Sequence, residues 1–183
     1  MNKKPIFAML AMLLPGTVFA HNLSVGEVLP NAMVADKGEI TLQDDKIVYQ
    51  DWSSDQLAGK VRVIQAIAGR SSAKAMNADL MTAITAADFP DDQYQTTTII
   101  NQDDAMWGTG SFVKSSAEDS KKDFSWSSMV LDAKGSVHKS WQLAAENSAI
   151  IVLDKNSQVL FVKEGKLTEQ EINQALELIK SNL

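Results

Sequence analysis

Hydrophobic and polar positions divide the middle of the chain into a strand, a helix and a second strand. Residues 61–67 are mostly apolar and rich in β-branched side chains, which is typical of a strand buried on both faces. Between 72 and 87 the apolar residues recur at helical spacing, and Ser71 or Ser72 stands where a helix cap is favoured. Residues 94–100 again favour a strand. This order predicts a βαβ unit whose parallel strands are joined by one helix.

Three further segments predict pairs of strands on either side of this unit. Residues 33–42 carry an Asp-Lys-Gly turn signal at 36–38 between short apolar stretches, so they predict a β-hairpin. Residues 128–137 and 149–159 each combine an apolar strand, a polar turn and a second strand. We therefore expect two more hairpins, with His138 on the second arm of the first.

The end of the chain predicts a helix. Thr168 and Glu171 form a capping-box pattern before a stripe of apolar residues at helical spacing. The pattern of residues 112–122 is ambiguous, and a helix is one reading of it. Taken together, the elements predict an α/β fold with a central mixed sheet, helices on both of its faces and an N-terminal β-hairpin. No linker divides residues 21–183, so we expect one domain there.

The first twenty residues have the pattern of a secretory signal peptide. Two lysines precede an apolar run at 6–14, and short side chains lie one and three positions before a cut after Ala20. The run is shorter than the roughly 20 apolar residues that span a bilayer. We therefore expect a signal peptide at 1–20 and an exported, periplasmic domain at 21–183 that has no membrane attachment after cleavage.

Charge and cysteine content narrow the classes of function. The chain has a formal net charge of −6. Removing the two lysines of the leader leaves fifteen basic and twenty-three acidic residues, a net charge of −8. An acidic domain of this kind is a poor match for nucleic acid. The chain has no cysteine, which excludes disulfides and every mechanism that uses a thiolate.

Several motifs resemble a known family. The Gly-Lys pair at 59–60 and the strand after it resemble the segment that leads to the active site in thioredoxin-like proteins of the peroxiredoxin and thiol-reductase type. A more specific resemblance, to the YtfJ family of small periplasmic bacterial proteins, extends over nearly all of residues 21–183. Its motifs lie at 59–63, 67–74, 94–101, 103–105 and 148–155.

This resemblance implies a thioredoxin-like, three-layer α/β/α fold but no particular activity. In thioredoxin-like enzymes the redox cysteines lie where the first strand of the βαβ unit passes into the helix, which here is Gly69–Lys74. A proline that is usually cis precedes a later strand, where this chain has Ser148. Both redox hallmarks are missing, so the resemblance implies the fold without the thiol chemistry.

The same resemblance brings three loops onto one surface, which is our candidate binding site. A helix N-terminus and two cations at 70–74 favour an anionic group, although a capped helix with solvated side chains also accounts for these residues. We expect a non-redox binding module for a periplasmic protein, a peptide or a small anionic ligand. The predicted ligand-binding residues are Arg70, Ser71, Ser72, Lys74, Asp103, Asp104 and Ser148.

The alternative is a serine-dependent hydrolase. Residues 69–73 approximate the G-x-S-x-A nucleophile turn, so Ser71 or Ser72 would act with an aspartate at 103–104 and with His138. Such short motifs recur by chance. The sequence predicts neither a cofactor nor a metal site, because the polar loop after 101 lacks the spacing of a calcium loop and only two histidines are present.

Overall fold

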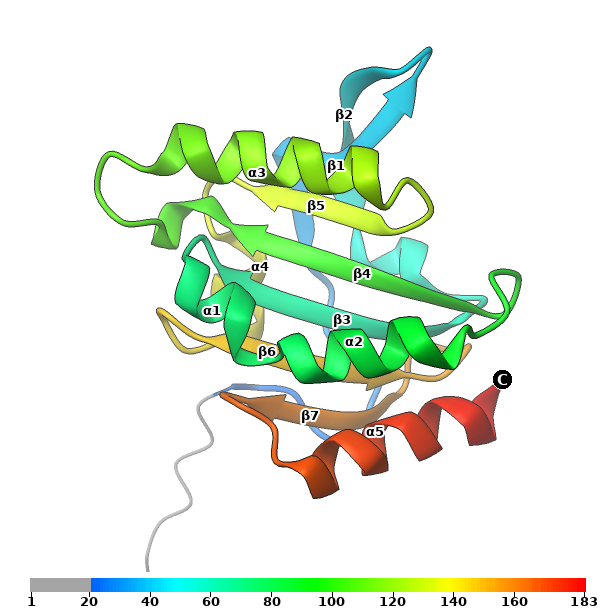
Figure 1. Ribbon diagram of the computed structural model, residues 1–183. Helices are drawn as coiled ribbons and strands as arrows, with labels where there is room; N and C mark the ends of the chain where they lie inside the picture. Colours follow the sequence, from blue (N-terminus) through cyan, green and yellow to red (C-terminus); the bar gives the residue numbers. More distant parts are fainter. Residues whose placement is uncertain (1–20) are drawn as a thin grey trace, which may run out of the picture.

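The computed structural model describes residues 21–183, and the predicted signal peptide at 1–20 lies outside the described residues. One seven-stranded mixed sheet runs through the molecule in the order β2-β1-β5-β4-β3-β6-β7 (Figure 1). The strands are β1 (Met33–Gln43), β2 (Lys46–Ser53), β3 (Val61–Ala68), β4 (Tyr94–Asn101), β5 (Ser128–Asp132), β6 (Ser148–Leu153) and β7 (Val159–Glu164).

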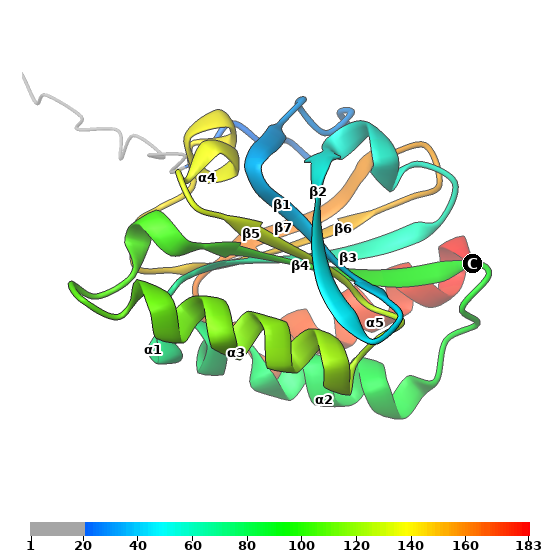
Figure 2. The same ribbon diagram turned by 90° about the horizontal axis from the view of Figure 1, so that it is seen from above.

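Helices cover both faces of this sheet, as predicted. The helices are α1 (Ser71–Met76), α2 (Ala78–Ala87), α3 (Gly110–Asp123), α4 (Ser136–Trp141) and α5 (Glu169–Asn182), with short 3-10 turns η1 (Ser54–Leu57) and η2 (Gln102–Asp104). Figure 2 shows α1, α2, α3 and α5 on one face and α4 on the other. Segment 21–32 shares the face of α4, because Leu23 and Leu29 belong to the same buried cluster as Trp141. No helix within 21–183 is long and apolar enough to cross a membrane.

Parallel pairing of β3, β4 and β5 places three strand ends side by side. Ala68 pairs with Asn101, and Asn101 pairs with Asp132. All eight residues of β3 are buried, as expected for a central strand flanked by neighbours and covered on both faces. The predicted βαβ unit is therefore confirmed, and its carboxyl edge holds two polar residues in one row.

The fold has an N-terminal hairpin, as predicted, but the predicted bounds and the turn at 36–38 are wrong, because residues 33–42 lie within β1 alone and β2 is the second arm. β1 continues to Gln43, and the reversal uses Asp44 and Asp45, which both have positive φ. The Asp-Lys-Gly segment forms a bulge inside β1 instead, where the register shifts between Val34 and Glu39. The Asp-Lys-Gly pattern therefore corresponds to a bulge inside a strand, where glycine is required, and not to the turn of the hairpin.

The predicted hairpin at 128–137 is also wrong, because β5 is followed by helix α4. The buried carboxylate of Asp132 accepts hydrogen bonds at 2.8 Å from the backbone N–H groups of Ser136 and Val137. It thereby satisfies donors that a helix leaves free in its first turn. His138 therefore lies on a helix instead of a strand. The second hairpin is confirmed as β6 and β7.

The single helix predicted at 72–87 is interrupted. α1 ends at Met76 and α2 begins at Ala78, with Asn77 between them. The predicted serine cap is wrong too: Arg70 occupies the N-cap position without a side-chain cap bond, and Ser71 is the first helical residue. Segment 112–122 lies within α3, and Thr168 with Glu171 forms both bonds of the predicted capping box.

Candidate functional site

The candidate site lies at the carboxyl edge of the parallel strands, where ligands often bind in α/β sheets. We call it the strand-end face and define it as residues 69–74, 101–109 and 133–147, which begin at or just after the ends of β3, β4 and β5. The first residue of β6 belongs to the same edge, because Ser148 pairs with Ile67 near the end of β3. The structure thus brings together the three loops that the family resemblance implies.

Arg70 ties these loops to one another. Its Nη2 atom lies 3.1 Å from Asp104 Oδ1 and 3.1 Å from Glu146 Oε1, and its Nε donates to the Asp104 carbonyl at 2.9 Å. The backbone N–H of Glu146 donates to the other Asp104 oxygen, Oδ2. The guanidinium therefore meets two carboxylates, and its charge is compensated within the protein. This arrangement fixes the loops but weakens the attraction for a separate anion.

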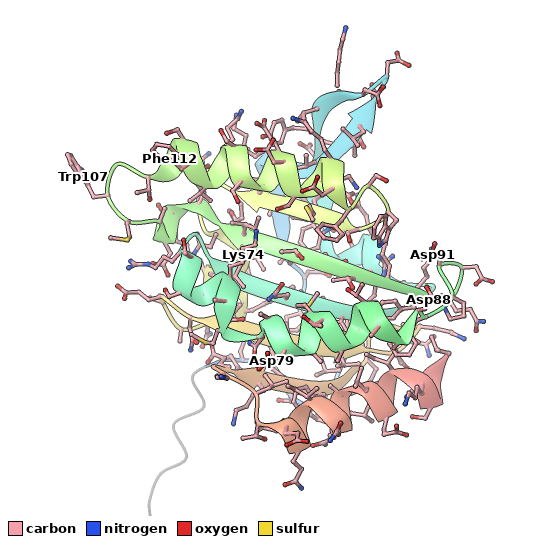
Figure 3. All side chains as sticks on the ribbon, in the orientation of Figure 1. Lys74, Asp79, Asp88, Asp91, Trp107 and Phe112 are labelled. Carbon is pink, nitrogen blue, oxygen red and sulfur yellow. The ribbon has the colours of Figure 1, made fainter. Side chains whose placement is uncertain are left out.

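The other predicted side chains are dispersed over this face. Ser71 and Ser72 are exposed on the first turn of α1. Lys74 Nζ lies 3.4 Å from Ser120 Oγ and so extends towards α3, as its position in Figure 3 shows. Asp103 pairs with Lys139 at 3.1 Å. Ser148 is buried, and its hydroxyl accepts a hydrogen bond from Asn77 at 3.0 Å, so it serves the interior.

An open pocket of about 420 Å³ lies between η2, α4 and the loop that follows α4. Two of the predicted site residues, Asp103 and Asp104, line this pocket. The other lining residues were not predicted from the sequence to belong to a binding site. A polar residue at the end of an apolar strand was the available signal for Asn101. The lining residues are Asn101, Asp103, Asp104, Gly135, His138, Lys139, Gln142, Leu143 and Ala145.

Two buried polar atoms of the pocket residues have no partner within 21–183. They are Asn101 Oδ1 and His138 Nδ1, on side chains whose residues are each only 6% exposed. A buried polar atom without a hydrogen bond costs about 1–3 kcal/mol, and folded proteins leave few of them. Both atoms have almost no solvent-accessible area, so they are enclosed by the protein and do not face the open space of the pocket.

Burial determines the charge of the His138 imidazole. Its pKa lies below the ordinary value of about 6.5, mainly because burial disfavours the charged ring. The carboxylates of Asp132, Asp104 and Glu164 act in the opposite direction without overcoming this effect. At neutral pH the ring is therefore uncharged, with one nitrogen that donates and one that accepts.

The lowered pKa of His138 predicts a loss of stability in mild acid. Below about pH 6.5 the unfolded chain binds a proton that the folded protein resists, so the free energy of unfolding falls as pH decreases. The contribution has a slope of up to about 1.4 kcal/mol per pH unit until the folded-state pKa is passed. Urea unfolding of His138→Gln between pH 7 and 5 should show a shallower slope than the parent protein.

His21→Gln is the matched control, because His21 is the other histidine of the chain. Equal slopes for His138→Gln and His21→Gln would contradict the assignment of the acid sensitivity to His138.

The arrangement that a serine hydrolase needs is not assembled in the described structure. Within residues 21–183, neither Ser71 nor Ser72 has a hydrogen bond to His138, and the Nδ1 atom of this ring meets no carboxylate. Asp103 and Asp104 are paired with Lys139 and Arg70 instead. No cluster of three or more potential metal ligands occurs in this part of the chain.

The sheet order, the βαβ unit and the cysteine-free loop after β3 define a thioredoxin-like domain that lacks thiol chemistry. The chain belongs to the family described as "Bacterial protein of unknown function (YtfJ_HI0045)", whose model matches residues 23–182. It is 45% identical to the uncharacterized protein YtfJ of Escherichia coli (strain K12), over 100% of both chains. An uncharacterized protein of Haemophilus influenzae is 45% identical over 97% of each chain.

Solved structures with the same architecture confirm the predicted fold. A thiol-disulfide isomerase from Corynebacterium glutamicum has a TM-score of 0.56 at 16% identity, covering 86% of this chain and 96% of its own. The thioredoxin domain of a thiol-disulfide oxidoreductase from Bacteroides vulgatus has a TM-score of 0.55 at 16% identity, covering 88% and 99%. Identities this low establish the fold alone.

Proposed function

We propose that the protein is a periplasmic binding module without redox activity, which holds a protein or peptide segment on its strand-end face. The observation that carries this proposal is a set of exposed apolar side chains beside the pocket. Trp107 is 100% exposed, and Met106 and Phe112 are also largely exposed. Figure 3 shows Trp107 and Phe112 at the same end of α3. Exposed aromatic residues of this kind commonly anchor interfaces between proteins.

The other residues of the face favour a peptide segment as the ligand rather than a small anion. The compensated charge of Arg70 offers little to a free anion, and Lys74 lies towards α3. The pocket and the aromatic group share one loop, since Asp103 and Asp104 come just before Met106 and Trp107. A peptide segment can contact both at once. The leader pattern at 1–20 supports export, so we propose a periplasmic partner.

Replacing Trp107 by alanine is expected to weaken peptide binding by about tenfold or more, because a central aromatic anchor contributes roughly 2 kcal/mol. The measurement screens the purified protein against an array of blocked decapeptides and then determines Kd for the strongest peptides by fluorescence anisotropy. Unfolding midpoints should be unchanged, since the side chain of Trp107 is fully exposed.

Trp126→Ala is the matched control for this experiment. Trp126 is also exposed, but it lies beyond the opposite end of α3, where it contacts Phe124 edge to face with ring centroids 5.5 Å apart. Its replacement should leave Kd unchanged. Equal effects of the two substitutions, or an array on which no peptide binds, would refute the proposed function.

A further inference from the structure

We infer that Met106 is a site of reversible oxidation, and that its conversion to methionine sulfoxide weakens the binding of a segment on the strand-end face. This inference rests on the proposed function and adds its regulation by peroxides. It is carried by the exposure of the Met106 thioether, by its place on the turn that presents Trp107, and by the absence of cysteine from the chain.

The thioethers of methionine are the side chains of this protein that peroxides oxidise most readily, because the chain has no cysteine. Exposure ranks the methionines of residues 21–183. Met106 and Met33 are 62% and 64% exposed, whereas Met129 is 6% exposed. Met76 and Met81 are partly buried. A peroxide in solution therefore reaches the sulfur atoms of Met106 and Met33 first.

The backbone ties Met106 to the proposed aromatic anchor. The Met106 carbonyl accepts hydrogen bonds from the Thr109 N–H at 3.0 Å and from the Thr109 hydroxyl at 2.7 Å. These bonds close a four-residue turn at 106–109, in which Trp107 is the second residue and Gly108 has a φ of +79°. Two exposed apolar side chains thus leave one fixed turn. We expect a segment seated on Trp107 to cover the Met106 thioether as well.

Met33 has the same chemistry and nearly the same exposure at a different place. It is the first residue of β1, where it pairs with Ser53 of β2. It lies outside the 106–109 turn and outside the strand-end face. Oxidation of Met33 should therefore leave binding on that face unchanged, which makes Met33 the matched control for Met106.

The modification transfers one oxygen atom from a peroxide to the sulfur of Met106. The O–O bond of the peroxide breaks and an S–O bond forms; the sulfur gives up two electrons, and the peroxide leaves as water or an alcohol. The product is polar, unlike the thioether. Its oxygen is hydrated on an exposed turn but loses water beneath an apolar ligand, which should weaken binding by about tenfold.

The test determines Kd before and after oxidation of the protein with hydrogen peroxide, using the tightest-binding decapeptide of the array that contains no methionine. Peptide mapping by mass spectrometry should find added oxygen on Met106 and Met33 before Met129. Kd should rise by about tenfold, and the two stereospecific methionine sulfoxide reductases together should restore it. The unfolding midpoint should not change, because the Met106 side chain is exposed.

Two leucine variants assign the effect to one sulfur atom. Met106→Leu keeps an apolar side chain of similar volume and removes the thioether, so it should bind the decapeptide like the parent protein and keep its Kd after oxidation. Met33→Leu retains Met106, so its Kd should rise on oxidation as much as that of the parent protein.

An unchanged Kd after full conversion of Met106 would overturn the inference. A Met106→Leu variant that still loses affinity on oxidation would also overturn it, because another group would then be responsible. The proposed function is judged separately: peptide binding that depends on Trp107 but survives oxidation would leave it standing. An unoxidised protein that binds no peptide would refute the proposed function and this inference together.

Discussion

Replacing Asn77 by alanine is expected to lower the free energy of unfolding by about 3–5 kcal/mol. The buried side-chain amide donates to Ser148 Oγ and to the Gly165 carbonyl, both at 3.0 Å, and its oxygen accepts from the Leu167 backbone N–H at 3.0 Å. Alanine leaves these three groups without partners, at about 1–3 kcal/mol for each that stays buried. Urea unfolding followed by circular dichroism measures the change.

Asn31→Ala is the control for this prediction, because Asn31 is an exposed asparagine in the lead-in before β1. Its replacement should change the free energy of unfolding by less than about 0.5 kcal/mol. A loss below about 1 kcal/mol for Asn77→Ala would show that the break between α1 and α2 does not depend on this amide. It would also show that the hydrogen bond from Asn77 is not what stabilises the buried hydroxyl of Ser148.

The second large effect is expected for Gly38→Ala, with a loss of about 4 kcal/mol. Gly38 has a φ of +78°, and a Cβ at this position would lie 2.0 Å from the backbone oxygen of Gln50 in the neighbouring strand. Backbone cannot rotate away as a side chain can, so β1 and β2 must separate locally. The estimate combines the strain of a positive φ with that of overpacking, each about 1–3 kcal/mol.

Gly59→Ala separates these two contributions. Gly59 also has a positive φ, +95°, but nothing lies within 4 Å of the position of its Cβ. This variant should lose only the conformational part, about 1–2 kcal/mol. Equal losses for the two variants would mean that the contact with Gln50 is relieved at no cost, and that the bulge in β1 is adaptable.

Elements whose signals are local were predicted well. The buried run of β3, the β-branched residues of β4 and the capping box of α5 each act over a few neighbouring residues, and all three elements are present. Motif resemblance supplied the thioredoxin-like arrangement and the meeting of the three loops. The mismatched turn of β1 and the break between α1 and α2 have a different origin, since a group elsewhere in the chain contacts each of them: Gln50 at Gly38 and Leu167 at Asn77. α4 differs from both, because Asp132, four residues before Ser136, starts it.

The candidate site illustrates that difference. Arg70 and Asp104 were both named from sequence, but only the structure shows that they pair and that the guanidinium is compensated by Glu146. His138 was expected on a strand because the apolar segment before it continued a hairpin pattern. The carboxylate of Asp132 starts α4 instead, and this helix carries His138 to the pocket.

The sequence by itself determined that this protein has no thiol chemistry, that its fold is α/β with a central βαβ unit, and which family it resembles. Composition and short-range periodicity suffice for these conclusions, because each depends on residue types and on neighbours along the chain. Only the tertiary structure decided where β1 turns, where the first long helix breaks and which residues line the pocket. Those features depend on contacts between segments far apart in sequence, such as Asn77 with Leu167 and Gly38 with Gln50, which no local pattern records.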